Sequence, residues 1–203
     1  MKIICIGRNY AAHISELKNE RPEYPLFFMK PDTALIPKDL PFFIPEFSNE
    51  IHYEVEFVLR ICKVGKHIQK RFAHTYFDQV ALGIDFTARD VQEHSRQNGL
   101  PWESAKAFDF SAPVGRFFPV SNFHDLNNID FRLEKNGEIV QKGNTSHMLF
   151  GFDEIISHVS KYITFKTGDL IFTGTPAGVG PVAINDVLTG FLFDEKVLTV
   201  KVK

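Results

Sequence analysis

Short apolar runs bounded by Gly, Pro, Asn or Asp recur along the whole chain, which is the pattern of β-strands. The predicted strands are residues 3–6, 26–29, 51–61, 79–85, 112–120, 129–135, 138–142, 169–173, 187–193 and 197–202. Asn136-Gly137 is predicted to join two of them in a tight hairpin, because Asn-Gly favours a turn whose twist matches that of the flanking strands.

Other segments show the helical spacing of apolar side chains instead. The predicted helices are residues 9–18, 88–97 and 150–161. In the first of them Tyr10, Ile14 and Leu17 share one face at spacings i, i+4 and i+7. His13 and Glu16 lie together beside that face, so this helix is predicted to have a core edge and a chemical edge.

The ratio of strands to helices decides the predicted fold class. The helices are too few to cover both faces of a doubly wound parallel sheet, so we predict an α+β fold with a mostly antiparallel, rolled or sandwiched sheet. Residues 31–50 are rich in proline and are predicted to be irregular. We find no composition break and no repeat, and we predict a single catalytic domain over residues 1–203.

Composition and charge exclude several classes of function. A hydrophobic content of 44% rules out a disordered chain, and a net charge of −2 predicts no nucleic-acid partner. No apolar run approaches the roughly 18 residues of a membrane span, and the N-terminal run is too short for a signal peptide. Only Cys5 and Cys62 occur; we place both in strands as buried thiols, which favours a cytoplasmic protein. The 21 phenylalanines predict surface that a homodimer buries.

Two carboxylates interrupt an otherwise apolar strand at Glu54 and Glu56. The two-residue period of a strand places both on one face, where burial would be costly unless a cation lay between them. Asp85, at the end of the next strand, could supply a third oxygen ligand. Three carboxylates favour a hard ion, Mg²⁺ first and Mn²⁺ next. The alternative is an edge strand with both glutamates on its solvent face.

His13 and Glu16, one helical turn apart, form a second candidate group. The carboxylate can hold the imidazole in one tautomer while the free nitrogen takes a proton from water. A lone His/Glu pair is more often part of a solvated helix face. The catalytic interpretation of this pair therefore depends on the other candidate residues.

Residues 174–181 form a glycine-rich loop after a strand, without the pattern of a nucleotide-binding loop. Its backbone N–H groups and the Thr175 hydroxyl could receive a small carboxylate, although a plain glycine turn explains the loop equally well. Lys106, flanked by apolar residues, suggests a buried cation that faces an anion. Arg8 and Lys30, each at a strand end, could be anion contacts or simply solvated charges.

These stretches together resemble the fumarylacetoacetate hydrolase family, and most closely its short branch of acylpyruvate hydrolases and oxaloacetate decarboxylases. The resemblance spans nearly the whole chain and follows the family's order of motifs. The matching segments are 6–13 (IGRNYAAH), 28–31 (FMKP), 52–56 (HYEVE), 85–92 (DFTARDVQ) and 174–176 (GTP). The chain has no room for the extra N-terminal domain of fumarylacetoacetate hydrolase itself, so that substrate is not expected.

By this resemblance Glu54, Glu56 and Asp85 match the metal ligands, while His13 and Glu16 match a dyad that activates water on a lid over the bound substrate. The positions that match substrate contacts are Arg8, Lys30, Gln92, Lys106 and Thr175. The family's fold is a mixed β-sandwich roll with a few peripheral helices, commonly found as a homodimer.

The resemblance implies Mg²⁺-dependent cleavage of the C–C bond of acylpyruvates, which are 1,3-diketo acids, to pyruvate and a carboxylic acid. His13 is expected to deprotonate water, Glu16 to steady the imidazolium, and Lys106 to stabilise the pyruvate enolate. The alternatives at the same site are oxaloacetate decarboxylation or tautomerisation and 2-hydroxyhepta-2,4-diene-1,7-dioate isomerisation. A further alternative, an inactive binding protein on this fold, is disfavoured because the acids and the dyad are present.

Overall fold

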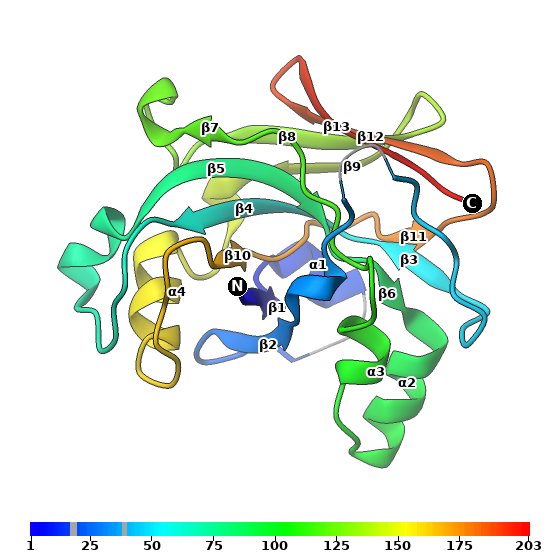
Figure 1. The fold of residues 1–203 in the computed structure, drawn as a ribbon, viewed down its shortest axis with the longest axis horizontal. Helices are drawn as coiled ribbons and strands as arrows, with labels where there is room; N and C mark the ends of the chain where they lie inside the picture. Colours follow the sequence, from blue (N-terminus) through cyan, green and yellow to red (C-terminus); the bar gives the residue numbers. More distant parts are fainter. Residues whose placement is uncertain (17–19, 38–39) are drawn as a thin grey trace.

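The strands of the protein form three sheets in a computed structural model that describes residues 1–16, 20–37 and 40–203 (Figure 1). The six-stranded sheet runs in the order β2 (Leu26–Lys30), β1 (Ile3–Gly7), β10 (Leu170–Phe172), β4 (Val55–Ile61), β5 (Phe77–Ile84) and β7 (Phe118–Pro119). The four-stranded sheet runs β13 (Glu195–Lys201), β12 (Val187–Leu192), β8 (Asp130–Lys135) and β9 (Glu138–Asn144). A three-stranded sheet runs β11 (Gly180–Pro181), β3 (Ile51–Tyr53) and β6 (Thr87–Ala88).

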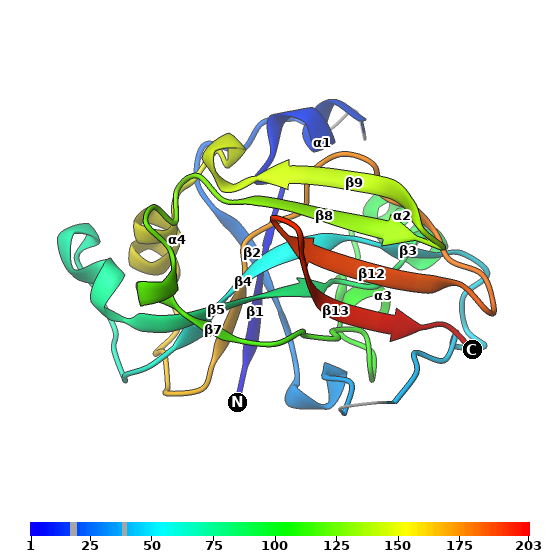
Figure 2. The ribbon, with the colours of Figure 1, turned by 90° about the horizontal axis from the view of Figure 1, so that it is seen from above.

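The sheets are mixed but mostly antiparallel. Only β1 and β10 pair in parallel among the named strands of the described residues. Seen from above, the four-stranded sheet lies across β4 and β5, with β12 and β13 packed on β5 and β8 packed on β4 (Figure 2). The predicted α+β fold with a rolled, mostly antiparallel sheet is therefore confirmed.

Short helices surround this roll. They are α1 (Ala11–Glu16), α2 (Arg89–Asn98), α3 (Glu103–Lys106) and α4 (Phe152–Val159). Figure 1 shows α4 at one end of the molecule and the packed pair α2 and α3 at the other. Among the described residues, no helix is long and apolar enough to cross a membrane.

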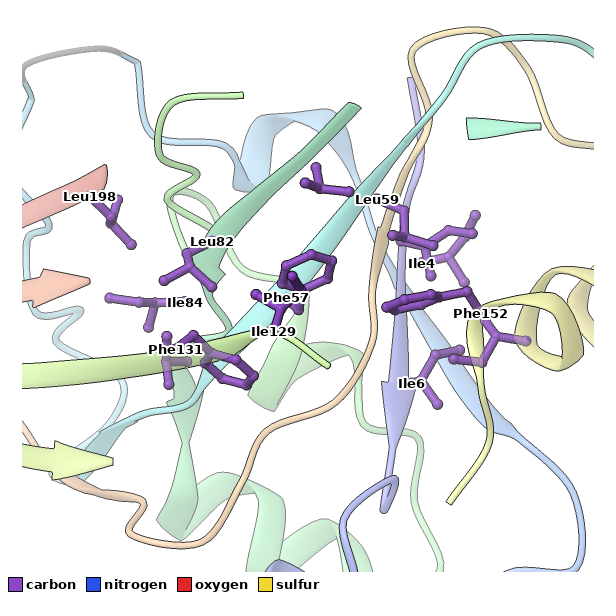
Figure 3. Close-up of a cluster of buried hydrophobic side chains, with 14 of the residues drawn as sticks. Ile4, Ile6, Phe57, Leu59, Leu82, Ile84, Ile129, Phe131, Phe152 and Leu198 are labelled. Atoms are coloured by element: carbon purple, nitrogen blue, oxygen red, sulfur yellow. The ribbon is translucent and has the colours of Figure 1, made fainter. Parts of the chain in front are cut away.

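Phenylalanine side chains fill the core between the sheets. Phe57 of β4 lies between Phe131 of β8 and Phe152 of α4, at ring-centroid distances of 6.5 and 5.7 Å (Figure 3). Leu82 of β5 and Ile4 of β1 extend this cluster to either side. Burial of each such side chain stabilises the fold by about 1.5–3 kcal/mol, so this layer holds the two sheets together.

The six-stranded sheet also buries its other face. Ile3, Cys5, Val58 and Phe172 form a second apolar cluster there. Strands that are covered on both faces show continuous apolar runs instead of alternation, which is the pattern of the first strand in the sequence.

Two predicted strands differ from those in the structure. The strand predicted over 51–61 is interrupted at Glu54, because the chain leaves the three-stranded sheet after β3 and enters the six-stranded sheet at β4. The strand predicted over 112–120 is wrong except at Phe118–Pro119, and residues 112 and 114 form only isolated bridges. Pro113 lies between them and has no N–H group for a continuous ladder.

Smaller corrections concern a helix and a cysteine. The first predicted helix, 9–18, is found as Ala11–Glu16, and its positions 17 and 18, Leu17 included, lie outside the described residues. The short α3 was not predicted. Cys5 is buried as predicted, but Cys62 follows the end of β4 and is partly exposed, so its assignment as a buried strand thiol is wrong.

Asn9 fixes the start of α1 against the rest of the fold. Its amide nitrogen donates to the carbonyl oxygens of Phe150 and Thr173, and its oxygen accepts the N–H of Phe150. The preceding Arg8 has a positive φ of 57°, which turns the chain sharply at the end of β1. The helix that carries His13 is thereby held close to the loop that follows β10.

Candidate active site

Three carboxylates converge where β4 begins and β5 ends. Glu54 lies at the break before β4, Glu56 on β4, and Asp85 directly after β5. One oxygen of each lies within 4.8 Å of the others. Their exposures are only 5%, 2% and 1%, so the alternative of two glutamates on a solvent face is wrong.

Buried cations already lie against two of these acids. Lys106 Nζ lies 2.8 Å from Glu54 Oε2 and 2.7 Å from Asp85 Oδ2. Lys30 Nζ lies 2.7 Å from Asp85 Oδ1, and Arg89 pairs with Glu54. Lys30 is 1% exposed, so its alternative as a solvated strand-end charge is wrong.

These contacts set the charges of the cluster. Burial alone would raise the pKa of Glu54, but the charges of Lys106 and Arg89 outweigh it and lower that pKa well below its usual range. Burial would likewise lower the pKa of Lys106, but the charges of Asp85 and Glu54 raise it. Glu54 is therefore a carboxylate and Lys106 an ammonium at neutral pH.

Glu56 differs from its two neighbours because it pairs with no cation among the described residues. Its Oε2 accepts the N–H of Gly174 at 2.6 Å. Burial and the charges of Asp85 and Glu54 raise its pKa well above the usual value. An all-carboxylate set with one uncompensated charge fits a divalent cation such as Mg²⁺ or Mn²⁺, which prefers oxygen ligands.

In protein freed of divalent metal, we expect Glu56→Gln to raise the free energy of unfolding at neutral pH by about 1 kcal/mol or more. The amide oxygen can still accept the N–H of Gly174, while the buried charge is removed. A carboxyl whose folded pKa is raised costs stability once the pH exceeds its unfolded pKa of about 4.3, so the difference should widen as pH rises from there. Urea unfolding with a chelator across pH measures this; equal stability at neutral pH would contradict it.

His13 and Glu16 form the second part of the site. His13 Nδ1 lies 3.1 Å from Glu16 Oε2, and His13 is only 7% exposed, so the alternative of a solvated pair is wrong for the imidazole. The other carboxylate oxygen, Oε1, accepts the N–H of Gly178 at 3.0 Å. A carboxylate that accepts the Nδ1 hydrogen leaves Nε2 as the basic nitrogen.

One cavity of about 70 Å³ joins these groups. Of the predicted site residues, those in its wall are Arg8, His13, Glu54, Glu56, Asp85, Gln92, Lys106 and Thr175. Lys30 and Glu16 are not in the wall: Lys30 pairs with Asp85, and Glu16 pairs with His13. The structure thus places every predicted site residue in the cavity wall or in contact with a residue of the wall.

Arg89 and Gln141 are among the polar residues of the site that were not singled out by the sequence, as is Arg96 in the cavity wall. Arg89, at the start of α2, donates to Glu54 and, through Nη1, to Gln92 Oε1 at 2.6 Å. Gln141 of β9 is 1% exposed and reaches the glycine-rich loop. The available signal for Gln141 was a polar residue at an inward position of a hairpin strand, where it lies opposite the core residue Leu133.

A mixed roll whose cavity holds a buried acid triad beside a His–Glu pair is the arrangement that the sequence motifs implied. The sequence model described as the C-terminal part of fumarylacetoacetate (FAA) hydrolase matches residues 2–202. The chain therefore belongs to the FAA hydrolase family.

The chain is also similar to individual proteins that are named as enzymes of oxo acids. The chain is 45% identical to the mouse mitochondrial oxaloacetate tautomerase FAHD1 over 184 residues, which are 91% of this chain and 83% of the relative. It is 39% identical to the Escherichia coli oxaloacetate tautomerase YcgM over 202 residues, 99% of this chain and 92% of that one. The solved structure of fumarylpyruvate hydrolase from Pseudomonas aeruginosa, in complex with Mn²⁺ and pyruvate, has a TM-score of 0.94 and 36% identity, covering 100% of this chain and 89% of that one. The protein is an enzyme of this family.

Proposed function

We propose that the protein is a divalent-metal-dependent enzyme of short 2-oxo acids, and that its principal reaction is the keto–enol tautomerisation of oxaloacetate. The observation that carries the proposal is the buried imidazole of His13, which pairs with Glu16 and lies beside the acid triad in one cavity. The similarity to oxaloacetate tautomerases supports the choice of substrate. Family membership also favours an enzyme over the alternative of an inactive binding protein.

Glu54, Glu56 and Asp85 would hold the ion, which would supply Lewis-acid polarisation of the keto oxygen and so acidify the hydrogens on C3. The basic Nε2 of His13 takes a proton from C3 of the keto form, and the electron pair of the C3–H bond forms the C2–C3 double bond. The imidazolium then gives the proton to the C2 oxygen, which restores the neutral imidazole. Glu16 accepts the Nδ1 hydrogen and balances the imidazolium. The reverse sequence converts the enol to the keto form.

Arg8, Gln92 and Thr175 line the cavity and are proposed to bind the carboxylates of the substrate. Lys106 and Lys30 hold Asp85 in place, and Lys106, which faces the cavity, is proposed to stabilise negative charge that develops on the substrate.

Acylpyruvate hydrolysis is the second candidate, and the similarity to fumarylpyruvate hydrolase favours it. In this reaction Nε2 of His13 takes a proton from water, and the hydroxide adds to the distal carbonyl carbon. The C–C bond between that carbon and C3 then breaks, its electron pair passes to the pyruvate enolate, and a proton returns to C3 to give pyruvate and a carboxylic acid. Lys106 is proposed to stabilise that enolate.

A substrate panel with Mg²⁺, with Mn²⁺ and with chelator tests the proposal. We expect rapid loss of the enol absorbance of oxaloacetate with a divalent ion and little with chelator. Loss of the diketo absorbance of acylpyruvates reports hydrolysis, and release of pyruvate from oxaloacetate reports decarboxylation. Conversion of 2-hydroxyhepta-2,4-diene-1,7-dioate to its isomer reports isomerisation. The ratio of rates with the two ions decides between our first choice, Mg²⁺, and Mn²⁺. No metal-dependent conversion of any substrate would contradict the proposal.

We expect the chain to form a homodimer in solution. Large apolar side chains remain exposed in the single chain, among them Leu40 (53%), Phe43 (63%) and Phe47 (53%). Such side chains are commonly covered by a second subunit. Analytical ultracentrifugation at micromolar concentration measures this, and a monomer alone would contradict it.

The cytoplasmic location stays a prediction from cysteine content, since the mouse relative is named as a mitochondrial protein. We also propose that residues 1–203 form a single catalytic domain.

A further inference from the structure

Gln141 is a buried polar side chain to which the proposed chemistry gives no task. It lies in the middle of β9 and makes three hydrogen bonds, each of 2.9 Å. Its Oε1 accepts the N–H of Val55, and its Nε2 donates to Thr175 Oγ1 and to the carbonyl oxygen of Pro176. A side chain of the four-stranded sheet thus connects the strand of the acids with the glycine-rich loop.

The backbone partners fix which way round the amide of Gln141 lies. The N–H of Val55 can only donate, so the amide oxygen must face it. The carbonyl of Pro176 can only accept, so the amide nitrogen must face the loop. Because the same nitrogen contacts Thr175, the hydroxyl oxygen of Thr175 is the acceptor in that bond.

The direction of this bond determines what the Thr175 hydroxyl can offer. A threonine hydroxyl has one hydrogen to donate, and the bond from Gln141 leaves that hydrogen unused. No protein group accepts it within the part of the chain that the structure describes. Thr175 lines the cavity, so its hydrogen can be donated to an anionic group bound there.

The local fold explains why a glutamine is needed at this place. Val55 lies between Glu54 and Glu56, beyond the residues of β4 that pair with β10, so its N–H lacks a ladder partner on that side. Gln141 supplies the missing acceptor. A buried N–H without a partner would otherwise cost free energy beside two of the acids.

The same loop is fastened on either side of Gln141. The N–H of Gly174 donates to Glu56, and the N–H of Gly178 donates to Glu16. Gly178 has a φ of 99°, and a Cβ atom there would lie 2.3 Å from the carbonyl oxygen of Val140. Glycine therefore lets the loop lie directly on β9, within reach of Gln141.

We propose that Gln141 is a positioning residue that presents the Thr175 hydroxyl as a hydrogen-bond donor to the carboxylate of the keto-acid substrate. This inference rests on the proposed function, since the carboxylate is that of the proposed substrate class. It assigns Gln141 no contact with the substrate.

Steady-state kinetics with oxaloacetate test this role. Gln141→Glu has nearly the same shape, but its carboxylate accepts the Thr175 hydrogen and turns it away from the cavity. We expect KM to rise roughly 10-fold to 100-fold, the worth of a hydrogen bond to a charged group, with kcat changed little because the bond forms equally in the ground and transition states. Thr175→Val should match this loss, and Thr175→Ser, which keeps the hydroxyl, should retain a KM near that of the wild type.

The double variant separates positioning from general damage. If Gln141 acts through Thr175, Gln141→Glu should add little to the KM of Thr175→Val. Additive losses, or a KM unchanged by Gln141→Glu, would overturn the proposal. Gln79→Glu is the matched control, since Gln79 lies on β5 and accepts a hydrogen bond from Arg60 that a carboxylate can also accept. Should Gln141→Glu fail to fold, Gln141→Met replaces it, with a smaller KM rise expected because the hydroxyl is then free to turn either way.

Hydrogen exchange of the metal-free protein provides a measurement that does not depend on turnover. In Gln141→Met the amide of Val55 loses its acceptor, so we expect faster exchange there and in residues 174–178, with no change in α4. Unchanged exchange at Val55 would overturn the proposed bond. Absence of turnover by the wild type would instead contradict the proposed function and the assignment of Thr175 with it. If the wild type turns over oxaloacetate and Gln141→Glu does so with an unchanged KM, only the positioning role of Gln141 is contradicted.

Discussion

Replacing Glu54, Glu56 or Asp85 by alanine is expected to abolish metal-dependent turnover, with kcat/KM falling by at least about 10²-fold in each variant. Each substitution removes one of three buried oxygens that lie within 4.8 Å of one another. Loss of a partner that only orients a ligand already costs about 10–100-fold in metal affinity or activity, so loss of a ligand itself should cost more. Calorimetric titration with Mn²⁺ measures the binding directly.

The three variants serve as controls for one another. Asp85→Ala leaves the ammonium groups of Lys30 and Lys106 with fewer partners, whereas Glu56→Ala removes a charge that has no cationic partner among the described residues. Asp85→Ala should therefore have a lower free energy of unfolding than Glu56→Ala, although both variants lose the metal. Asp194→Ala, at a fully exposed position, should bind and turn over as the wild type does. Wild-type Mn²⁺ affinity in any two of the triad variants would disprove a shared site.

The convergence of the acids could be predicted from the sequence because it depends on local rules. Alternation along one predicted strand puts Glu54 and Glu56 on the same side, and Asp85 directly follows β5, which pairs with β4. The interruption at Glu54 could not be predicted, because it arises where the chain passes from one sheet to another. Only the assembled sheets determine that passage.

The partners of the acids depend on contacts between distant segments. Lys30 and Lys106 reach Asp85 from β2 and α3, and no period in the sequence pairs those segments with the end of β5. The hydrogen bonds of Gln141 also join distant segments, since they connect β9 with residues 55 and 175. The sequence therefore indicated the candidate ligands, while the surrounding hydrogen bonds and ion pairs required the tertiary structure.

His13→Ala is expected to lower kcat for oxaloacetate tautomerisation and for acylpyruvate hydrolysis by roughly 10²–10⁴-fold, the usual worth of a positioned general base. The affinity for Mn²⁺ and the KM should change little, because His13 is not among the three acids. Oxaloacetate decarboxylation needs neither an attacking water nor removal of a C3 proton, so it should fall less. His124→Ala, at an exposed histidine, is the control. An equal loss of all three reactions, or a loss of substrate binding, would move His13 from proton transfer to lid closure or substrate contact.

Glu16→Gln is expected to lower kcat nearly as much as His13→Ala does, although glutamine has the same shape as glutamate. Glu16 accepts two hydrogen bonds, one at each oxygen, from Gly178 N–H and from His13 Nδ1–H. Glutamine has one oxygen, so satisfying the Gly178 N–H turns its NH₂ group toward Nδ1. That imidazole must then carry its hydrogen on Nε2, where it cannot act as a base. Kinetics over pH would show a large fall in kcat with KM nearly unchanged; a loss below about tenfold would mean that Glu16 does not select the tautomer of His13.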